Sequence, residues 1–182
     1  VIVKHNNPCG ISSHKNHLKS YQLALASDPI SAYGGIVSCN FKITKKLALE
    51  LNKIFLEVIV ANGFDLAALK ILKKKKNLRV IDSSKLTKKN LYNHVSIFNS
   101  ILVQSPDIQP FTKNNFKVVS KIKPNLKTYK DLIFAFNACR FVKSNAIVIA
   151  KNSSSIGIGA GQPSRLDSCK IAIEKMKKFN PL

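Results

Sequence analysis

The segment KHNNPCG (residues 4–10) holds the densest group of side chains that could do chemistry. A lysine, an imidazole and two amides directly after an apolar stretch could move a proton and hold a developing oxyanion. In a regular strand Lys4 and His5 would point to opposite faces, so they converge only if the strand breaks, which Asn, Pro and Gly favour. The alternative is an ordinary turn in which the histidine has no catalytic role. No second cysteine follows Pro8-Cys9 at zinc-deaminase spacing, so the sequence indicates no catalytic metal.

Three further loops place glycines or polar groups beside an apolar run. DPISAYGG (residues 28–35) has paired glycines, which let a backbone approach a ligand or, as the favoured alternative, another strand. GIGAGQPSR (residues 157–165) is a glycine-rich turn into a helix, where backbone N–H groups form a cradle for an anion or a carboxamide. It fits neither the dinucleotide fingerprint nor the P-loop. KSN (residues 143–145) places three polar groups directly before an apolar run that reads as a buried strand. These groups are candidates for ligand contacts, and the alternative is that Ser144 or Asn145 caps the backbone.

These loops require an alternation of strands and helices to hold them. Apolar runs of strand length span residues 1–4, 36–39, 57–61, 78–81, 101–104, 116–119, 146–150 and 155–158. Segments of helical period span residues 14–27, 45–55, 66–75, 129–143 and 165–178, with Thr44, Asp65 and Thr128 as expected N-caps. The pattern predicts an α/β fold whose ligand sites gather in loops at strand ends. We expect residues 83–125, where helical pattern is poor, to join two lobes of about residues 1–104 and 105–182.

Composition limits the classes of protein that fit. The chain has 182 residues, no apolar run long enough to span a membrane and four cysteines without C-x-x-C spacing, so we expect a cytoplasmic protein with reduced thiols. It begins Val1-Ile2 without an initiator Met, so we expect a piece of a longer protein. The net charge of +21 is typical of nucleic-acid binding, but only three of the 30 cations are Arg and the lysines are spread along the chain. We therefore attribute the positive charge to an accumulation of lysine at solvent-exposed positions, rather than to a surface that binds nucleic acid.

Five segments together resemble one family in its own order along the chain. They are KHNNPCG, DPISAYGGIV, EVIVANGFDLAALKILKKKKNLRVI, FVKSNAIVIAK and GIGAGQPSRLDS. The resemblance is to the transformylase domain of the bifunctional purine biosynthesis enzymes, aminoimidazole carboxamide ribonucleotide (AICAR) transformylase/IMP cyclohydrolase. It implies a cytidine-deaminase-like three-layer α/β fold without zinc, with a mixed sheet flanked by helices and incomplete at both ends. No segment resembles the cyclohydrolase domain.

The family's activity implies roles for particular residues. Its members transfer a formyl group from 10-formyltetrahydrofolate to the exocyclic amine of the AICAR nucleotide. The resemblance implies that His5 accepts the proton and that Lys4 stabilises the transition state. Positions implied to contact the substrates are Gly34, Glu57, Asn145, Gly161 and Gln162 for the nucleotide, and Arg165 and Leu166 for the folate. It also implies a homodimer, and neither a nucleic-acid nor a membrane partner.

The sequence departs from the family's pattern in places. Asn62 stands where the family has proline, and Asn99-Ser100 where it has a glycine pair, which suggests an altered folate side. Family segments that grip the nucleotide phosphate and the folate should lie upstream of Val1 and beyond Leu182, so we expect these 182 residues alone to be inactive. Two other classes stay open at this point. One is a basic module that binds a nucleotide or nucleic acid without catalysis, and the other is a decayed, noncatalytic homologue.

Overall fold

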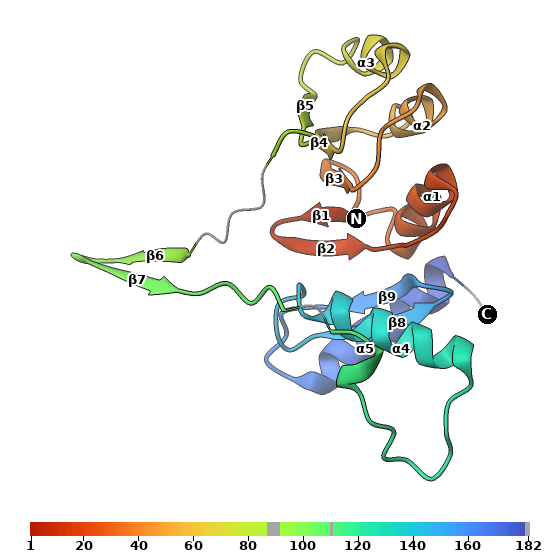
Figure 1. The fold of residues 1–182 in the computed structure, drawn as a ribbon, viewed down its shortest axis with the longest axis vertical. Coiled ribbons are helices and arrows are strands. Elements are labelled where there is room, and N and C mark those ends of the chain that lie inside the picture. The colour runs from red at the N-terminus through yellow and green to blue at the C-terminus, as the bar shows by residue number, and fades with distance from the viewer. Residues whose placement is uncertain (87–91, 110, 181–182) are drawn as a thin grey trace.

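A five-stranded mixed sheet forms the N-terminal part of the molecule in a computed structural model that describes residues 1–86, 92–109 and 111–180 (Figure 1). The strands lie in the order β2-β1-β3-β4-β5. Strand β1 is antiparallel to both of its neighbours, whereas β3, β4 and β5 are parallel. The bounds are β1 Ile2–Lys4, β2 Asn7–Gly10, β3 Gly35–Cys39, β4 Leu56–Ala61 and β5 Arg79–Asp82. The predicted α/β class with a mixed sheet is confirmed.

Three helices cover one face of this sheet: α1 (His17–Ser27), α2 (Lys45–Leu51) and α3 (Leu66–Leu72) (Figure 1). Asn16 and Thr44 cap α1 and α2 by accepting from the backbone N–H groups of Lys19 and Leu47. Asp65 lies at the N-cap position of α3 but makes no side-chain capping bond. Apolar residues of the three helices and of β1, β3 and β4 form one buried cluster, which fixes the strand ends that carry the loops.

The C-terminal part consists of α4 (Leu126–Cys139), the antiparallel hairpin of β8 (Ile147–Lys151) and β9 (Ser154–Gly159), and α5 (Arg165–Phe179). Helix α5 packs on β9, while α4 packs on β8 and lies over the opposite face of the first sheet. There Phe134 of α4 and Phe141, just beyond its end, share a cavity with Val1 and Val3. The sheet is therefore flanked by helices on both faces.

Strand β9 belongs to a separate two-stranded sheet, but it bonds to the segment that follows β2. The backbone N–H of Ser155 donates to the Ile11 carbonyl over 2.8 Å, and that of Ser13 donates to the Ser153 carbonyl over 2.8 Å. Glycines let α5 approach closely, since a Cβ atom at Gly159 would lie only 1.9 Å from the Ser168 carbonyl oxygen. The two parts thus meet along hydrogen-bonded backbone. The predicted division into two lobes near residue 104 stays a prediction.

A second hairpin, β6 (Asn93–Ile97) with β7 (Ser100–Gln104), extends away from both parts (Figure 1). All ten of its strand residues are exposed. We call it the arm.

Some predicted elements differ from the structure. The apolar run of residues 116–119 forms no strand, because within the described residues it has no neighbouring strand to bond with. Helix α4 begins three residues earlier than predicted, since Asn125 rather than Thr128 accepts the capping bond. Residues 7–10 were expected to be loop but form β2. Residues 87–91 and 110 of the expected connecting segment lie outside the described residues. No helix in the described ranges is long and apolar enough to cross a membrane.

Candidate active site

The turn between β1 and β2 consists of His5 and Asn6, both with left-handed backbone at φ 50° and 61°. Two-residue hairpin turns of type I′ require this conformation at both positions, and asparagine and histidine adopt it more often than most other non-glycine residues. Lys4 pairs with Asn7 across the turn, so β1 breaks directly after Lys4, as the sequence predicts. His5 is exposed at the tip, and its strained backbone is of the kind that clusters at functional sites.

Lys4 reaches from this turn to residues 28–35. Its ammonium donates a hydrogen bond to the Tyr33 carbonyl. A Cβ atom at Gly34 would lie 3.5 Å from Lys4 Nζ and 3.6 Å from the ring of Phe55. Gly34 also has φ +70°, and its N–H donates to the Phe55 carbonyl over 2.8 Å. The glycine is therefore required by its backbone conformation, since a Cβ atom there would make only ordinary contacts, and it leaves Lys4 beside open backbone.

Glu57 lies at a bulge at the same end of the sheet. Gly35 pairs with Leu56 and Ile36 with Val58, so Glu57 is the extra residue in β4. Bulges re-aim side chains and are frequent beside active sites. The side chain is exposed, and it forms no ion pair within the described part of the chain. Its carboxylate is available to accept hydrogen bonds from a ligand.

The loop of residues 143–145 meets both the β1–β2 turn and the glycine-rich turn. The Asn7 side-chain oxygen accepts from the Lys143 N–H over 2.9 Å, and the Lys143 carbonyl accepts from the Gly161 N–H over 2.7 Å. The Asn145 side-chain nitrogen donates to the carbonyls of Gln162 and Pro163 over 3.0 and 2.8 Å. Asn145 therefore holds the two loops together, and its side-chain oxygen is what it can offer to a ligand.

The glycine-rich turn ends at α5. Gly161 has φ +68° and Ser164 caps the helix by accepting from the Asp167 N–H. Arg165 and Leu166 follow at the helix start, and the Leu166 side chain is 72% exposed. A cation beside an exposed apolar side chain can bind a ligand that has both an anionic and an apolar part. Gln162 instead turns toward its own loop, where its amide donates to the Ala160 carbonyl over 3.2 Å.

The contacts thus link the four loops in series, from residues 28–35 through the β1–β2 turn and residues 143–145 to the glycine-rich turn. Lys4, Gly34 and Glu57 form one end of this series, and Asn145, Gly161 and Gln162 form the other, with Arg165 and Leu166 beyond it. Sequence reasoning missed the linking role of Asn7. Its position in KHNNPCG was the available signal, because an amide opposite Lys4 in a hairpin can reach outward from the strand edge.

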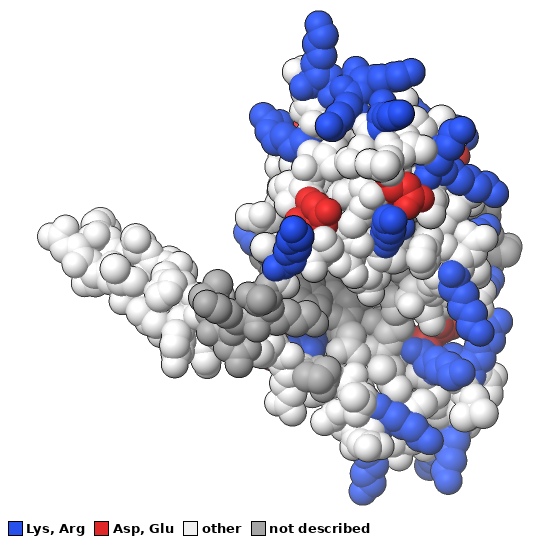
Figure 2. Space-filling view, turned by 45° about the horizontal axis from the view of Figure 1, so that its top comes forward, with Lys and Arg blue, Asp and Glu red and all other residues white. Residues whose placement is uncertain are grey.

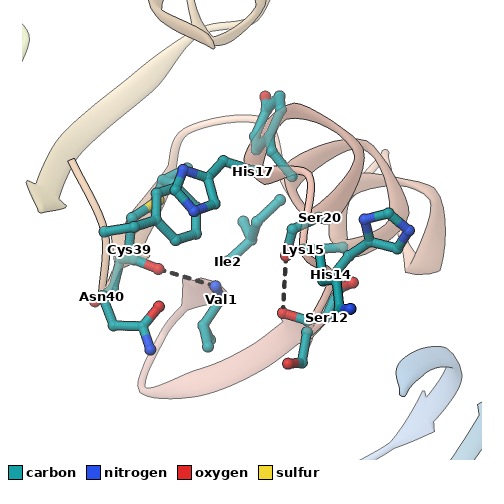
Figure 3. A pocket seen from close by; sticks show the side chains of 15 residues that line it. Val1, Ile2, Ser12, His14, Lys15, His17, Ser20, Cys39 and Asn40 are labelled. Atoms are coloured by element: carbon teal, nitrogen blue, oxygen red, sulfur yellow. Dashed lines mark hydrogen bonds between the residues drawn. The ribbon is translucent and has the colours of Figure 1, made fainter. Parts of the chain in front are cut away.

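Of two cavities in the molecule, one lies away from these loops and the other borders the β1–β2 turn at Asn6. One, of about 540 Å³, is at the amino end of β1, lined by polar side chains that include His14, His17 and Asn40 (Figure 3). The other, of about 630 Å³, is the mostly apolar space under α4. Neither is lined by Lys4, His5 or Asn145.

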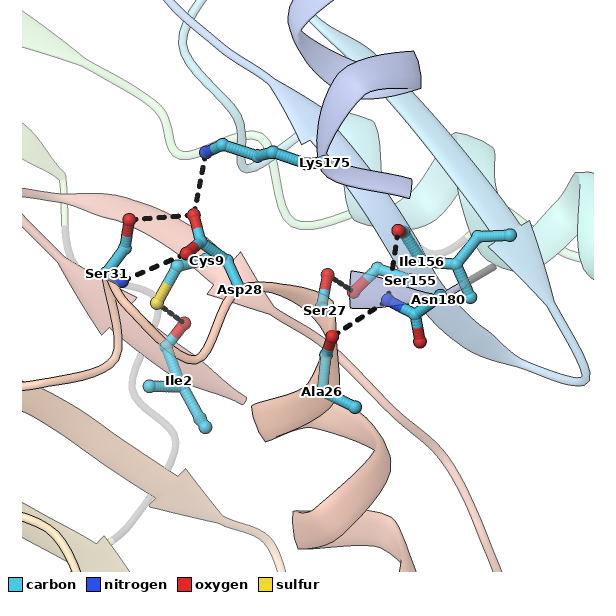
Figure 4. A network of polar contacts seen from close by, with 10 residues as sticks. All are labelled: Ile2, Cys9, Ala26, Ser27, Asp28, Ser31, Ser155, Ile156, Lys175 and Asn180. Atoms are coloured by element: carbon cyan, nitrogen blue, oxygen red, sulfur yellow. Dashed lines mark hydrogen bonds and ion pairs between the residues drawn. The ribbon is translucent and has the colours of Figure 1, made fainter. Parts of the chain in front are cut away.

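The remaining candidate nucleophile near the site is Cys9, which is buried with its thiol directed to the Ile2 carbonyl over 3.5 Å (Figure 4). Burial first, and then the charge of Asp28, raise the pKa of Cys9 to about 11, so it stays a neutral thiol near pH 7. Among the described residues no three His, Cys, Asp or Glu side chains gather to hold a metal ion. The groups left for chemistry are the Lys4 ammonium and the His5 imidazole.

The fold and these loops define an α/β protein with a site of acid–base type built on loops at strand ends. The chain belongs to the AICARFT/IMPCHase bienzyme family, whose model matches residues 1–175.

Relatives from three bacteria share 44–46% of their residues with the chain, and each is named bifunctional purine biosynthesis protein PurH. The relative from Prochlorococcus marinus (strain MIT 9515) is 46% identical over 182 residues, covering 99% of this chain and 35% of that protein. The one from Persephonella marina is 46% identical over 184 residues with the same coverage, 99% and 35%. The one from Buchnera aphidicola subsp. Schizaphis graminum is 44% identical, again over 99% and 35%. The chain thus spans about 35% of the length of these relatives.

Proposed function

We propose that the complete protein containing this chain transfers a formyl group from 10-formyltetrahydrofolate to the exocyclic amine of the AICAR nucleotide, in the synthesis of purines. The observation that carries the proposal is the Lys4–His5 break at the end of β1, tied on one side to the Gly34 loop and on the other to Asn145. Membership in the bienzyme family supports it, as do the names of the relatives.

The proposed reaction needs a base and a partner for an oxyanion. An amine conjugated to an imidazole ring is a poor nucleophile, and a neutral histidine suits the removal of its proton near pH 7. The amine nitrogen bonds to the formyl carbon as its proton passes to His5. The carbon's bond to the folate nitrogen then breaks as the protonated His5 returns the proton to that nitrogen, which gives tetrahydrofolate. The Lys4 ammonium gives one hydrogen bond to Tyr33 and has two N–H donors left for the tetrahedral oxyanion.

The other site residues would hold the two substrates. Glu57 and the Asn145 oxygen can bond to the ribose or base, and Gly34 and Gly161 leave room for a ligand to approach the backbone. Gln162, turned toward its own loop, would shape that wall. Arg165 suits the anionic glutamate of the folate, and Leu166 suits its ring. The proposal includes a cytoplasmic homodimer, which the exposed and uncharged arm supports, and no catalytic metal.

A noncatalytic basic module finds less support. Lysines are scattered over the body in Figure 2, and the arm carries no charge at all. Steep loss of binding to random DNA with added salt would favour the basic module.

The test is formyl transfer by the complete protein with His5→Ala, and with His14→Ala as the matched control. His14 is an exposed histidine at the far cavity. We expect His5→Ala to lower kcat by about a hundredfold, the usual contribution of a positioned base, and His14→Ala to change it little. An inactive wild-type protein would indicate a decayed homologue, and an unaffected His5→Ala would remove His5 as the base. We expect the 182 residues alone to be inactive.

A further inference from the structure

Asp28 is the most deeply buried acid near the candidate site. It follows α1, is 4% exposed, and its carboxylate has three partners (Figure 4). Lys175 Nζ lies 2.8 Å from Oδ2, the Ser31 hydroxyl donates to Oδ2 over 2.7 Å, and the Ser31 N–H donates to Oδ1 over 2.9 Å. Burial opposes ionisation, but the hydrogen bonds from Lys175 and Ser31 outweigh it and lower the pKa of Asp28. The carboxylate is thus a charged, fully bonded anchor.

This anchor fixes the segment that receives Lys4. The Asp28 carbonyl accepts from the Ala32 N–H over 3.2 Å, and the Ala32 carbonyl accepts from the Gly35 N–H over 3.0 Å. Between residues 28 and 35 the buried side chains are those of Asp28 and Ala32, since Tyr33 is 62% exposed. The place of the Tyr33 carbonyl therefore depends on how Asp28 holds the start of the turn.

Lys175 connects the same anchor to the opposite side of the site. It lies on α5, the helix that begins with Arg165 and Leu166, and α5 is seated on β9 by the close glycine contacts. A chain of direct contacts runs from α5 through Lys175, Asp28 and the turn to the Tyr33 carbonyl and the Lys4 ammonium.

We infer that Asp28, paired with Lys175, is a positioning residue that sets the position of the Lys4 ammonium for formyl transfer. The catalytic part of this inference rests on the proposed function. A purely structural ion pair would make the protein less stable when broken but would leave Lys4 and kcat unchanged. A displacement of about 1 Å at a catalytic group can cost as much as a hundredfold in rate, so the two roles have different signatures.

The experiment compares Asp28→Asn, Lys175→Met, Lys175→Arg and Ser31→Ala in the complete protein. Lys170→Met is the matched control, because Lys170 also lies on α5 and faces an acid, Asp167, but in an exposed pair at 3.6 Å. Well below the unfolding temperature, we expect Asp28→Asn and Lys175→Met to lower kcat about tenfold, within the range a misplaced group can produce, while the nucleotide KM stays nearly constant. Lys175→Arg keeps the charge and should restore most of the rate. Ser31→Ala should give a smaller loss, and Lys170→Met none.

A second readout does not depend on turnover. Acetic anhydride labels free amines, and peptide mass mapping gives the labelling rate of Lys4 relative to Lys170. We expect Asp28→Asn and Ser31→Ala to raise this ratio, because the Lys4 ammonium is no longer held at the Tyr33 carbonyl. Unchanged kcat together with an unchanged ratio in folded variants would overturn the inference. If Asp28→Asn does not fold, Ser31→Ala decides by the same two measurements. If the wild-type protein lacks formyl transfer but the variants still raise the labelling ratio, the positioning of Lys4 by Asp28 is kept and the proposed function is rejected.

Discussion

The molecule contains two hairpins that both have two-residue turns but have opposite surroundings. Strands β1 and β2 are joined by two residues, His5 and Asn6, and strands β6 and β7 by Phe98 and Asn99. In both turns the first residue is a non-glycine with left-handed backbone, at φ 50° for His5 and 49° for Phe98. A two-residue turn that begins with a left-handed residue therefore does not by itself make a hairpin a candidate active site.

The difference lies in what surrounds each hairpin. The first is bordered by β3 on one side and meets β9 on the other, with Ile2, Pro8, Cys9 and Gly10 buried. The second has no buried strand residue, and Phe98 is fully exposed. An isolated two-stranded hairpin is marginally stable, so it cannot hold a side chain in place by itself. Packing around β1 and β2 is what gives Lys4 and His5 a defined position.

The largest effect should come from breaking that packing. A Cβ atom at Gly10 would lie 1.8 Å from the Ala24 carbonyl oxygen, so Gly10→Val must separate β2 from α1. We expect a loss of more than about 4 kcal/mol, seen as low soluble yield and fast hydrogen exchange in β1 and β2. Ser100→Val in the exposed strand β7 is the control and should leave both measurements near wild type. Equal tolerance of the two substitutions would mean that β2 is no better packed than the arm.

The next effect concerns chemistry rather than folding. Lys4→Met in the complete protein should lower kcat for formyl transfer by about a hundredfold, as loss of one oxyanion donor does, with a smaller change in nucleotide KM. Lys15→Met, an exposed lysine near the far cavity, should leave kcat unchanged. Equal damage to kcat and nucleotide affinity would assign Lys4 to ground-state binding instead.

The two hairpins also show what the sequence could and could not predict. The apolar run before Lys4 and the break after it were readable, because hydrophobic pattern and turn residues are local signals. Strand β2 was not, since the sequence Asn-Pro-Cys-Gly has a loop composition and pairs only because β1 and α1 border it. Residues 116–119 show the opposite error. Their pattern predicts a strand, but they have no partner strand in the described part of the chain and form none.

The candidate site also has one part that the sequence could predict and one part that it could not. Its loops were predicted from glycines and polar side chains, but the bonds that join them connect residues far apart in sequence. Asn7 bonds to Lys143 across 136 positions, and Asp28 pairs with Lys175 on the last helix. No local pattern carries such pairings, because they arise only when the fold has brought β2 and β9 to neighbouring positions.

The smallest effect should come from the arm's turn. Phe98→Ser removes an aromatic side chain that makes no buried contact, so we expect the stability of the body to change by less than about 0.5 kcal/mol. Hydrogen exchange of β3 and β4 in the complete protein measures this without interference from assembly, which sedimentation follows separately. Phe41→Ser is the matched comparison, because the Phe41 ring is stacked on His17 at 3.9 Å and packs against the core. It should speed exchange in β3 and β4, whereas Phe98→Ser should not. If Phe98→Ser speeds exchange as much as Phe41→Ser does, the arm contributes to the stability of the sheet, and the contrast between a packed and an unpacked hairpin is wrong.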